Sequence, residues 1–263
     1  MKKIGIIFNK ERKPETEGPS LKIAKWLKKN KHKAFINPDE KTLDKGLDFI
    51  VTVGGDGTVL RTADRIMKYK IPLVGINFGH KGFLCDIKVG ETYDKIKKIL
   101  EGKYIIEKRS RVCADVISSG KKIKSFDALN EITIGGISRT VFLEMKVSIE
   151  KRVFKALISG DGVIISTKTG STGYNINAGG PMLMSDVFSV VANNANFDSD
   201  HLMRNTKSFI ISTRAVFEIK ILNVFKENLP SIIADGQRDC KIAENNSISI
   251  RKSKNHTYFI KIS

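Results

Sequence analysis

Hydrophobic and polar positions follow two different periods along this chain. Up to residue 104, short unbroken apolar runs alternate with segments in which apolar residues recur every three or four positions. This pattern predicts strands over Lys3–Phe8, Phe49–Val53 and Pro72–Ile76, and helices from Gly18, over Thr58–Lys68 and over Glu91–Leu100. Strands that are apolar on both faces and alternate with helices are typical of a parallel sheet covered on both sides. Residues 1–104 are therefore predicted to form an α/β domain.

From residue 105 onwards the period changes to two. Apolar residues occupy every second position over Leu143–Ile149 and over Phe217–Ile221, and the same alternation returns at Ile248 and Ile250 and at Tyr258, Ile260 and Ile262. Ser231–Ala234 runs into Asp235-Gly236, a strong signal for a two-residue hairpin turn. Residues 105–263 are thus predicted to form a mostly antiparallel β domain with one face of each sheet buried, interrupted by a helix over Tyr174–Val191. The end of the chain either stays in this domain or packs back on the first.

Composition fits a globular protein, since 41% of the 263 residues are hydrophobic. No apolar run approaches the length of about 18 residues that a membrane span needs. The apolar stretch at the N-terminus stops at Asn9, which is too short for the core of a signal peptide. We therefore expect a soluble, cytoplasmic protein without a membrane partner.

The chain is strongly basic, with 46 Lys and Arg against 28 Asp and Glu and a formal net charge of +18. The lysines are spread along the whole sequence and form no basic arm, which favours a solvated surface over a nucleic-acid site. A third interpretation, between these two, is that the positive charge attracts a polyanionic small molecule.

The sequence shows no pattern of metal ligands. The cysteines Cys85, Cys113 and Cys240 form no CxxC pair, and the four histidines are scattered, so no metal site built from protein ligands is predicted.

The first candidate site is Gly54-Gly55-Asp56-Gly57-Thr58, which follows an apolar strand and opens a helix. Glycines permit close approach of the backbone, and a helix start offers free N–H groups and a positive dipole end, so the loop is suited to phosphates. It matches neither the Walker A loop nor the dinucleotide fingerprint. Asp56 could take a proton from an attacking hydroxyl or help to hold Mg²⁺. The structural alternative is a tight turn in which Asp56 caps the helix.

The second candidate site runs from Asp161 to Tyr174, where a predicted strand leads into a loop rich in glycine and hydroxyl groups. Thr169, Ser171 and Thr172, beside free N–H groups, are suited to phosphate or ribose oxygens, although such a turn can also simply cap a helix. Gly179-Gly180-Pro181 adds a further point of close backbone approach.

Two further motifs carry polar or aromatic groups at strand ends. Asn130-Glu131 interrupts an apolar stretch, and its amide and carboxylate could bind a base edge and ribose hydroxyls, unless the strand simply turns into solvent here. Phe83 lies in the glycine-rich segment 75–84, just beyond a predicted parallel strand, where ligands of such sheets bind. It could stack on a base or pack in the core.

The motifs GGDGT, GINFGHKGFL, ALNEITI and DGVIISTKTGSTGY…AGGP, in this order, resemble those of the NAD kinase family over residues 1 to about 240. GGDGT alone also resembles loops of diacylglycerol and sphingosine kinases and of phosphofructokinases, whereas NE with TGSTxY is more specific. The resemblance implies a Rossmann-like α/β domain and a β-sandwich-like domain, with the site in the cleft between them. It also implies ATP-dependent phosphorylation of NAD at the adenosine ribose 2′-hydroxyl, a divalent metal such as Mg²⁺, and a homodimer or homotetramer.

The resemblance also assigns roles to individual residues. Asp56 would be the general base, Gly55 and Gly57 would contact substrate through the backbone, and Arg61 would lie near phosphate. Phe83 would pack by the adenine, and Asn130 and Glu131 would bind ribose or nicotinamide-side groups. The NAD pocket would further include Asp161, Thr169, Ser171, Thr172, Gly173, Tyr174, Asn175, Asn177 and Gln237. The chain departs from the usual family pattern at Lys81, Ser159, Lys168 and Gly173.

Two other functions remain open from the residues. A lipid or sugar kinase with the same loop would need an apolar acceptor groove, against which the Asn130-Glu131 pair and the hydroxyl-rich loop argue. A nonenzymatic nucleotide or nucleic-acid binder would use the net charge and would not depend on Asp56 for turnover.

Overall fold

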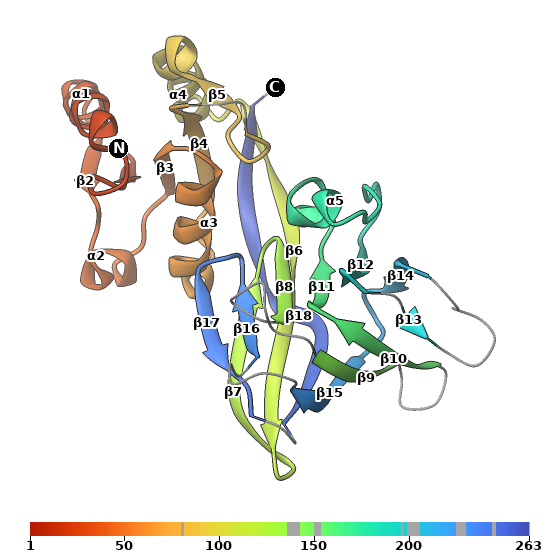
Figure 1. Ribbon diagram of the computed structural model, residues 1–263. Helices are drawn as coiled ribbons and strands as arrows, with labels where there is room; N and C mark the ends of the chain where they lie inside the picture. The colour runs from red at the N-terminus through yellow and green to blue at the C-terminus, as the bar shows by residue number, and fades with distance from the viewer. Residues whose placement is uncertain are drawn as a thin grey trace. The chain divides into compact units, whose positions relative to one another are not determined.

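A computed structural model describes residues 1–79, 82–135, 143–149, 154–195, 197–198, 206–224, 230–243 and 246–262. The chain forms two compact units, Met1–Arg109 with His256–Ser263, and Ser110–Asn255. The polypeptide passes from one unit to the other along β6 (Tyr104–Ser118) and along β18 (Ser247–Ile262) (Figure 1). Each unit is described separately below.

The first unit is built on a parallel sheet in the order β2-β1-β3-β4, with β5 and the end of β18 both pairing with β4. These strands are β1 (Lys3–Phe8), β2 (Lys33–Ile36), β3 (Phe49–Gly54), β4 (Leu73–Asn77) and β5 (Ile87–Lys88). The central strand β3 is buried over its whole length, which confirms the parallel α/β domain predicted from its unbroken apolar run.

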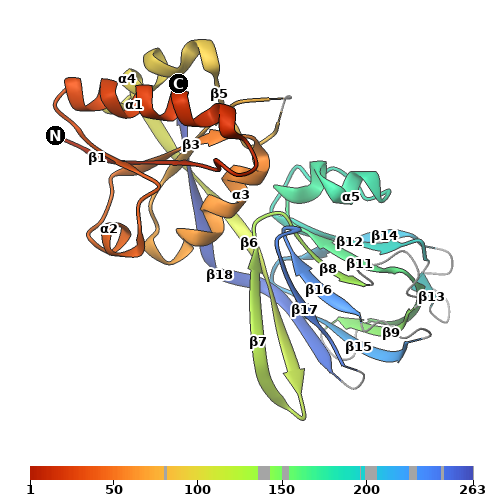
Figure 2. The same cartoon turned by 60° about the vertical axis from the view of Figure 1, so that its left-hand side comes forward.

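Helices cover both faces of this sheet. They are α1 (Glu17–Lys29), α2 (Glu40–Asp44), α3 (Asp56–Arg65) and α4 (Thr92–Leu100), with short 3₁₀ turns at Pro14–Thr16, Met67–Tyr69 and Val89–Glu91. Figure 2 shows α1 and α4 on one side of the strands and α2 and α3 on the other. The helix predicted over Thr58–Lys68 begins two residues earlier, at Asp56, and gives way to a 3₁₀ turn at Met67.

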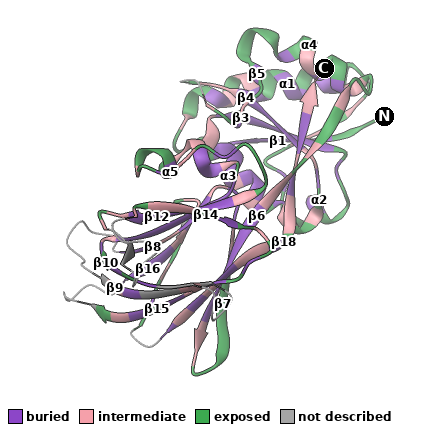
Figure 3. Cartoon of the chain, turned by 90° about the vertical axis from the view of Figure 1, so that its right-hand side faces the viewer, coloured by how far each residue is buried: buried purple, intermediate pink, exposed green. Residues whose placement is uncertain are grey.

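The second unit packs two antiparallel layers. One sheet has the order β14-β12-β11-β8-β16-β17, and the other contains β13-β10-β9-β15-β18 with the β6–β7 hairpin paired to β18. The strands not yet delimited are β7 (Lys121–Ala128), β8 (Glu131–Gly135), β9 (Leu143–Ile149), β10 (Phe154–Gly160), β11 (Gly162–Ser166), β12 (Val187–Asn193), β13 (Phe197–Asp198), β14 (Ser208–Ser212), β15 (Phe217–Val224), β16 (Ser231–Ala234) and β17 (Arg238–Lys241). Buried residues from both layers, among them Ile134, Phe188 and Phe217, form one core, so the sandwich-like fold is confirmed (Figure 3).

The predicted helix over Tyr174–Val191 is wrong for most of its length. Only Tyr174–Asn177 is helical (α5), and Val187–Asn193 forms the strand β12, which is buried on both faces along its central five residues. A short apolar run that is buried on both faces has no alternation, so its pattern does not distinguish strand from helix. By contrast, the predicted hairpin at Asp235-Gly236 is confirmed, since β16 pairs with β17 and both turn residues have positive φ.

Candidate active site

In the first unit, the loop after β3 turns sharply into α3. A Cβ on Gly54 would lie 3.0 Å from the Cβ of Thr58, so only glycine fits where the chain folds back on itself. Gly55 is the N-cap of α3 and accepts the Thr58 N–H at 2.9 Å. The first N–H groups of the helix therefore lie beyond the carboxyl end of β3, where parallel sheets bind their ligands.

Asp56, the first residue of α3, is fixed through its side chain. Its carboxylate accepts the backbone N–H of Phe83 at 2.8 Å and that of Leu84 at 3.1 Å. Gly82 packs so closely against this carboxylate that an added Cβ would lie 2.7 Å from its Cγ. The two glycine-rich segments found in the sequence are thus joined by one half-buried acid, which makes Asp56 more than a helix cap.

Arg61 and Phe83 flank this loop. A Cβ on Gly57 would lie 3.8 Å from a guanidinium nitrogen of Arg61, so the guanidinium lies over the first turn of α3. Phe83 is 67% exposed, which contradicts the core-packing alternative and leaves its ring available to a ligand. His80 and Lys81, which precede Phe83 in the glycine-rich segment 75–84, lie outside the described residues.

In the second unit, Asn130 and Glu131 form a corner between two strands. β7 ends at Ala128 and β8 begins at Glu131, so the strand does end here, but it does not turn into solvent. Glu131 is only 8% exposed. Its burial, and secondarily the charge of Asp235, raise the pKa of Glu131 to about 8.

The corner is held from both sides by side chains whose supporting role the sequence did not reveal. Asp235 accepts the backbone N–H groups of Leu129, Asn130 and Glu131 at 2.8, 2.7 and 3.3 Å. Thr167 donates its hydroxyl to the Leu129 carbonyl at 2.6 Å, and its N–H to the Asn130 carbonyl at 2.8 Å. With its backbone groups satisfied in this way, the corner is a rigid support for two polar side chains.

The hydroxyl-rich loop lies against this corner. A Cβ on Gly170 would lie 2.6 Å from Cα of Asn130, and one on Gly173 would lie 3.9 Å from the Asn130 amide nitrogen and 4.0 Å from Oε2 of Glu131. Asn130, Glu131 and the loop from Gly170 to Gly173 are therefore neighbours in one unit.

Other residues of the loop divide into structural and accessible ones. Ser171 and Asn175 are buried, and their side chains hydrogen bond to the Lys168, Ser171 and Pro181 carbonyls and to the Leu183 N–H. Of the side chains predicted to bind substrate, those of Thr169, Thr172, Tyr174 and Asn177 are accessible.

Asp161 and Gln237 lie further from the corner. The register of β8 and β11 pairs Glu131 with Ser166 and Gly135 with Gly162, so Asp161 lies at the opposite end of β11 from Glu131. Asp161 accepts a hydrogen bond from Asn194 at 2.7 Å. Gln237 is exposed at the end of the hairpin turn and donates its N–H to the Ala234 carbonyl at 3.0 Å.

Three buried acceptors in this region have no hydrogen-bond partner in the described structure. They are Oδ1 of Asn130, Oε2 of Glu131 and Oδ1 of Asn175. A buried polar atom without a partner is costly, so the Asn130 and Glu131 oxygens mark the place where ligand hydroxyl or amide groups would complete the network.

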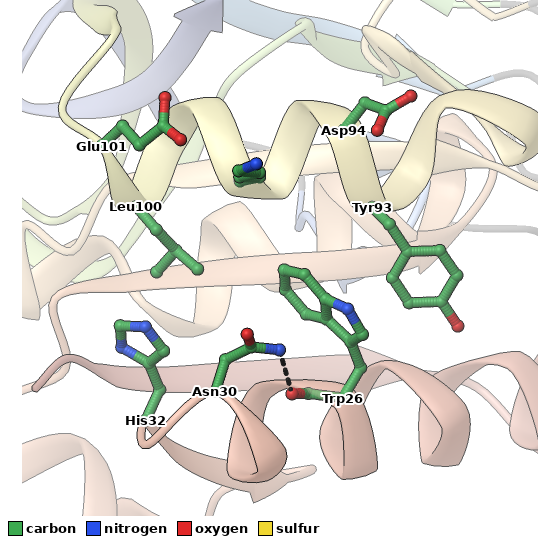
Figure 4. A pocket seen from close by; sticks show the side chains of 8 residues that line it. Trp26, Asn30, His32, Tyr93, Asp94, Leu100 and Glu101 are labelled. Carbon is green, nitrogen blue, oxygen red and sulfur yellow. Dashed lines mark hydrogen bonds between the residues drawn. The ribbon is translucent and has the colours of Figure 1, made fainter.

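A separate cavity of about 580 Å³ lies between α1 and α4 in the first unit (Figure 4). Trp26 from α1 and Tyr93 from α4 have ring centroids 5.4 Å apart, and Asn30 donates to the Trp26 carbonyl. None of the motif residues lines this cavity, so we do not assign it to the candidate site.

Residues for holding a metal are few. Among the described residues no group of three or more His, Cys, Asp or Glu side chains could hold an ion. Mg²⁺ in phosphate-transfer sites takes only one or two carboxylates, together with substrate phosphates and waters. Asp56 is a carboxylate beside the phosphate-type loop, so it could serve as such a single carboxylate ligand.

Among the helices of the described part of the chain, none is long and apolar enough to cross a membrane.

Comparison with known proteins agrees with this arrangement. The ATP-NAD kinase N-terminal domain matches residues 39–104, and the ATP-NAD kinase C-terminal domain matches residues 129–262. An NAD kinase from Clostridium kluyveri is 32% identical over 269 residues, covering 99% of this chain and 91% of that protein.

Solved structures show the same fold. The NAD kinase from Archaeoglobus fulgidus in complex with ATP aligns with a TM-score of 0.77 and 25% identity, covering 99% of this chain and 94% of that one. Yeast NADH kinase complexed with NADH also aligns with a TM-score of 0.77, at 16% identity over 100% of this chain and 84% of that one.

The fold and these matches define an enzyme of the kinase class, a transferase of phosphoryl groups. Within that class, the chain belongs to the NAD kinase family.

Proposed function

We propose that the protein transfers the γ-phosphoryl group of ATP to the 2′-hydroxyl of the adenosine ribose of NAD, giving NADP, with Asp56 as general base. The observation that carries this proposal is the fixed carboxylate of Asp56 at the start of α3, held by the Phe83 and Leu84 N–H groups. These bonds orient the carboxylate and leave lone pairs on both oxygens to accept the hydroxyl proton.

The acceptor side is supported by the second unit. Asn130 and Glu131, with their unpartnered oxygens, would bind ribose or nicotinamide-side groups, and the accessible residues Thr169, Thr172 and Tyr174 would line the NAD pocket. At neutral pH the raised pKa of Glu131 keeps a proton on its carboxyl group, so this side chain can both donate to and accept from a hydroxyl.

The donor side is supported by the first unit. The N-terminus of α3 and the Arg61 guanidinium provide positive charge for phosphate oxygens. Mg²⁺ bound to the donor phosphates would neutralise charge on the transferred group. Asp56 is the residue that would contact the ion. Phosphoryl transfer depends mainly on such positioning and charge stabilisation, which these residues are suited to supply.

The substitution Asp56→Asn tests this function. It keeps the shape of the side chain but removes the base, and we expect kcat to fall by roughly 10²–10⁴-fold with KM and thermal unfolding little changed. Asp44→Asn is a matched control, because Asp44 is exposed at the end of α2 in the same unit. The assay follows NADP⁺ from NAD⁺ and ATP, with NADH and diacylglycerol as competing acceptors. If the purified wild-type chain forms no NADP⁺, the proposed function is wrong.

A further inference from the structure

Within the first unit, β18 reaches the segment that holds Asp56. Along one edge of β4, β18 pairs at Leu73 and β5 pairs at Ile76 and Asn77. The end of β18 therefore lies beside the start of β5 (Figure 1). Residues 83–86 lead directly into β5, and the first two of them donate the N–H groups that fix the Asp56 carboxylate. One end of this segment is thus anchored on Asp56.

Lys261 of β18 binds the other end of the segment. Its ammonium donates to both carboxylate oxygens of Asp86, each at 2.8 Å. The same ammonium lies 3.5 Å from Oε2 of Glu107, which pairs with Arg109 at 3.0 Å. The Arg109 guanidinium in turn lies over the ring of Phe259, 4.3 Å from its centroid. Lys261 is therefore held in a network of charges on neighbouring strands, and its contact with Asp86 has a defined geometry.

The backbone between these two anchors is packed against β4. Leu84 is buried. A Cβ added to Gly75 of β4 would lie 2.9 Å from Sγ of Cys85, 3.0 Å from Cα of Cys85 and 3.1 Å from the Leu84 carbonyl oxygen. Closely packed groups transmit a displacement and do not absorb it. A shift of Asp86 would therefore move the Leu84 N–H and, with it, the Asp56 carboxylate.

Cys85 lies between the two acids of this arrangement. Burial, and then the charges of Asp56 and Asp86, raise the pKa of the Cys85 thiol to about 12. The thiol stays protonated at neutral pH, so it does not compete with Asp86 for the Lys261 ammonium. The ion pair therefore lies close to Asp56 in space, although β18 and α3 are far apart in the sequence.

We propose that Lys261 is a positioning residue that holds Asp56 in place for phosphoryl transfer. It acts through Asp86 and the backbone of residues 83–84. The proposal rests on the proposed function, in which Asp56 is the general base. Exposed ion pairs add little to overall stability, and the side chains of Lys261 and Asp86 are 30% and 31% exposed. We therefore expect loss of the pair to lower kcat far more than it lowers thermal stability.

The test compares Lys261→Met with Lys2→Met. Lys2 pairs with Asp48 at 2.9 Å in the same unit, but the two residues precede β1 and β3 and so lie at the opposite end of these strands from the GGDGT loop. For Lys261→Met we expect kcat to fall by about tenfold, with KM for ATP and for NAD⁺ changed less than about twofold, because the base is misplaced while substrate contacts remain. Lys2→Met should keep kcat. Lys261→Arg should also keep most of it, since a guanidinium can donate to both carboxylate oxygens.

A double-variant cycle separates position from charge. Asp86→Ala removes the other half of the ion pair, so a positional link predicts the same loss of kcat as in Lys261→Met and no further loss in the double variant. A direct effect of the Asp86 charge on Asp56 predicts opposite changes, because Lys261→Met uncovers that charge and Asp86→Ala removes it. Equal, non-additive losses support the proposal, and opposite changes contradict it.

Amide hydrogen exchange, measured by NMR, reads the same link without turnover. The Phe83 and Leu84 N–H groups donate to Asp56, so their protection reports how firmly the carboxylate is held. We expect these two amides to exchange about tenfold faster in Lys261→Met than in the wild-type protein, and at the wild-type rate in Lys2→Met.

The outcomes separate this inference from the proposed function. Unchanged kcat and exchange in Lys261→Met, or equal effects in Lys261→Met and Lys2→Met, would show that the ion pair does not position Asp56. A rise in KM in place of a fall in kcat would also contradict the inference. So would equal losses in Lys261→Met and Lys261→Arg with unchanged thermal unfolding. If the wild-type chain forms no NADP⁺ but the two amides lose protection in Lys261→Met, the link to Asp56 stands and the proposed function fails.

Discussion

Asp235 holds Asn130 in place across 105 residues of sequence, with its Oδ1 accepting the Asn130 N–H at 2.7 Å. The same carboxylate accepts the N–H groups of Leu129 and Glu131, so one side chain in a hairpin turn organises the whole corner. Burial raises the pKa of Asp235, while these N–H groups and the charge of Arg111 act in the opposite direction. A substrate-binding role for Asn130 would therefore depend on Asp235, which holds the backbone of the corner.

For Asp235→Asn we expect a loss of about 2–3 kcal/mol in the free energy of unfolding, measured by urea denaturation. The amide has one acceptor oxygen in place of two and leaves buried N–H groups without a partner. Asp239→Asn is the control, since Asp239 is exposed in the same hairpin. In kinetics, KM for NAD⁺ should rise while KM for ATP does not. A variant as stable as the control would show that the carboxylate does not hold the corner.

The raised pKa of Glu131 should be visible in the dependence of stability on pH. An acid whose pKa rises on folding binds its proton more tightly in the native state. Its contribution to stability is therefore complete below its ordinary pKa of 4.5 and is lost as pH rises through about 8. Glu131→Gln removes this titration, so between pH 5 and 8 the wild-type protein should lose up to about 1.4 kcal/mol per pH unit relative to the variant. Parallel pH curves for the two proteins would contradict the buried, protonated Glu131.

Gly82 should be intolerant of any side chain because of its contact with Asp56. A methyl group there would displace the carboxylate from the Phe83 and Leu84 N–H groups. We expect Gly82→Ala to lower kcat by at least about tenfold, since misplacing a catalytic group by about 1 Å can cost 10²-fold. Gly90→Ala is the control, because a Cβ there meets nothing within 4 Å and its φ is not positive. Equal kcat values in the two variants would show that the packing of Gly82 does not fix Asp56.

Local signals in the sequence were sufficient for β3 with the turn after it, and for the hairpin between β16 and β17. The unbroken apolar run of β3 and the glycines after it predicted both the buried strand and a turn into a helix, although α3 begins at Asp56 and not at the predicted Thr58. The Asp235-Gly236 dipeptide predicted the hairpin because its two residues must adopt positive φ. Each of these features depends on a few consecutive residues.

The supporting contacts could not be predicted in the same way. Lys13 reaches the Phe78 carbonyl across 65 residues, and Thr167 reaches the Leu129 carbonyl across 38. Such pairs are set by strand order and register, which one sequence does not reveal. The role of Asp235 was missed because its turn chemistry alone explained why it was there.

The final strand has a consequence for how the protein is made. Residues 256–262 belong to the first unit, where Phe259 of β18 lies opposite Leu73 of β4. During synthesis β5 can pair with β4 at Ile76 and Asn77 as soon as it is made, but the Leu73 end of that edge stays open until the entire antiparallel unit has been translated. Until then β4 is a site for mispairing with other nascent chains, which makes the interval a vulnerable stage of biogenesis.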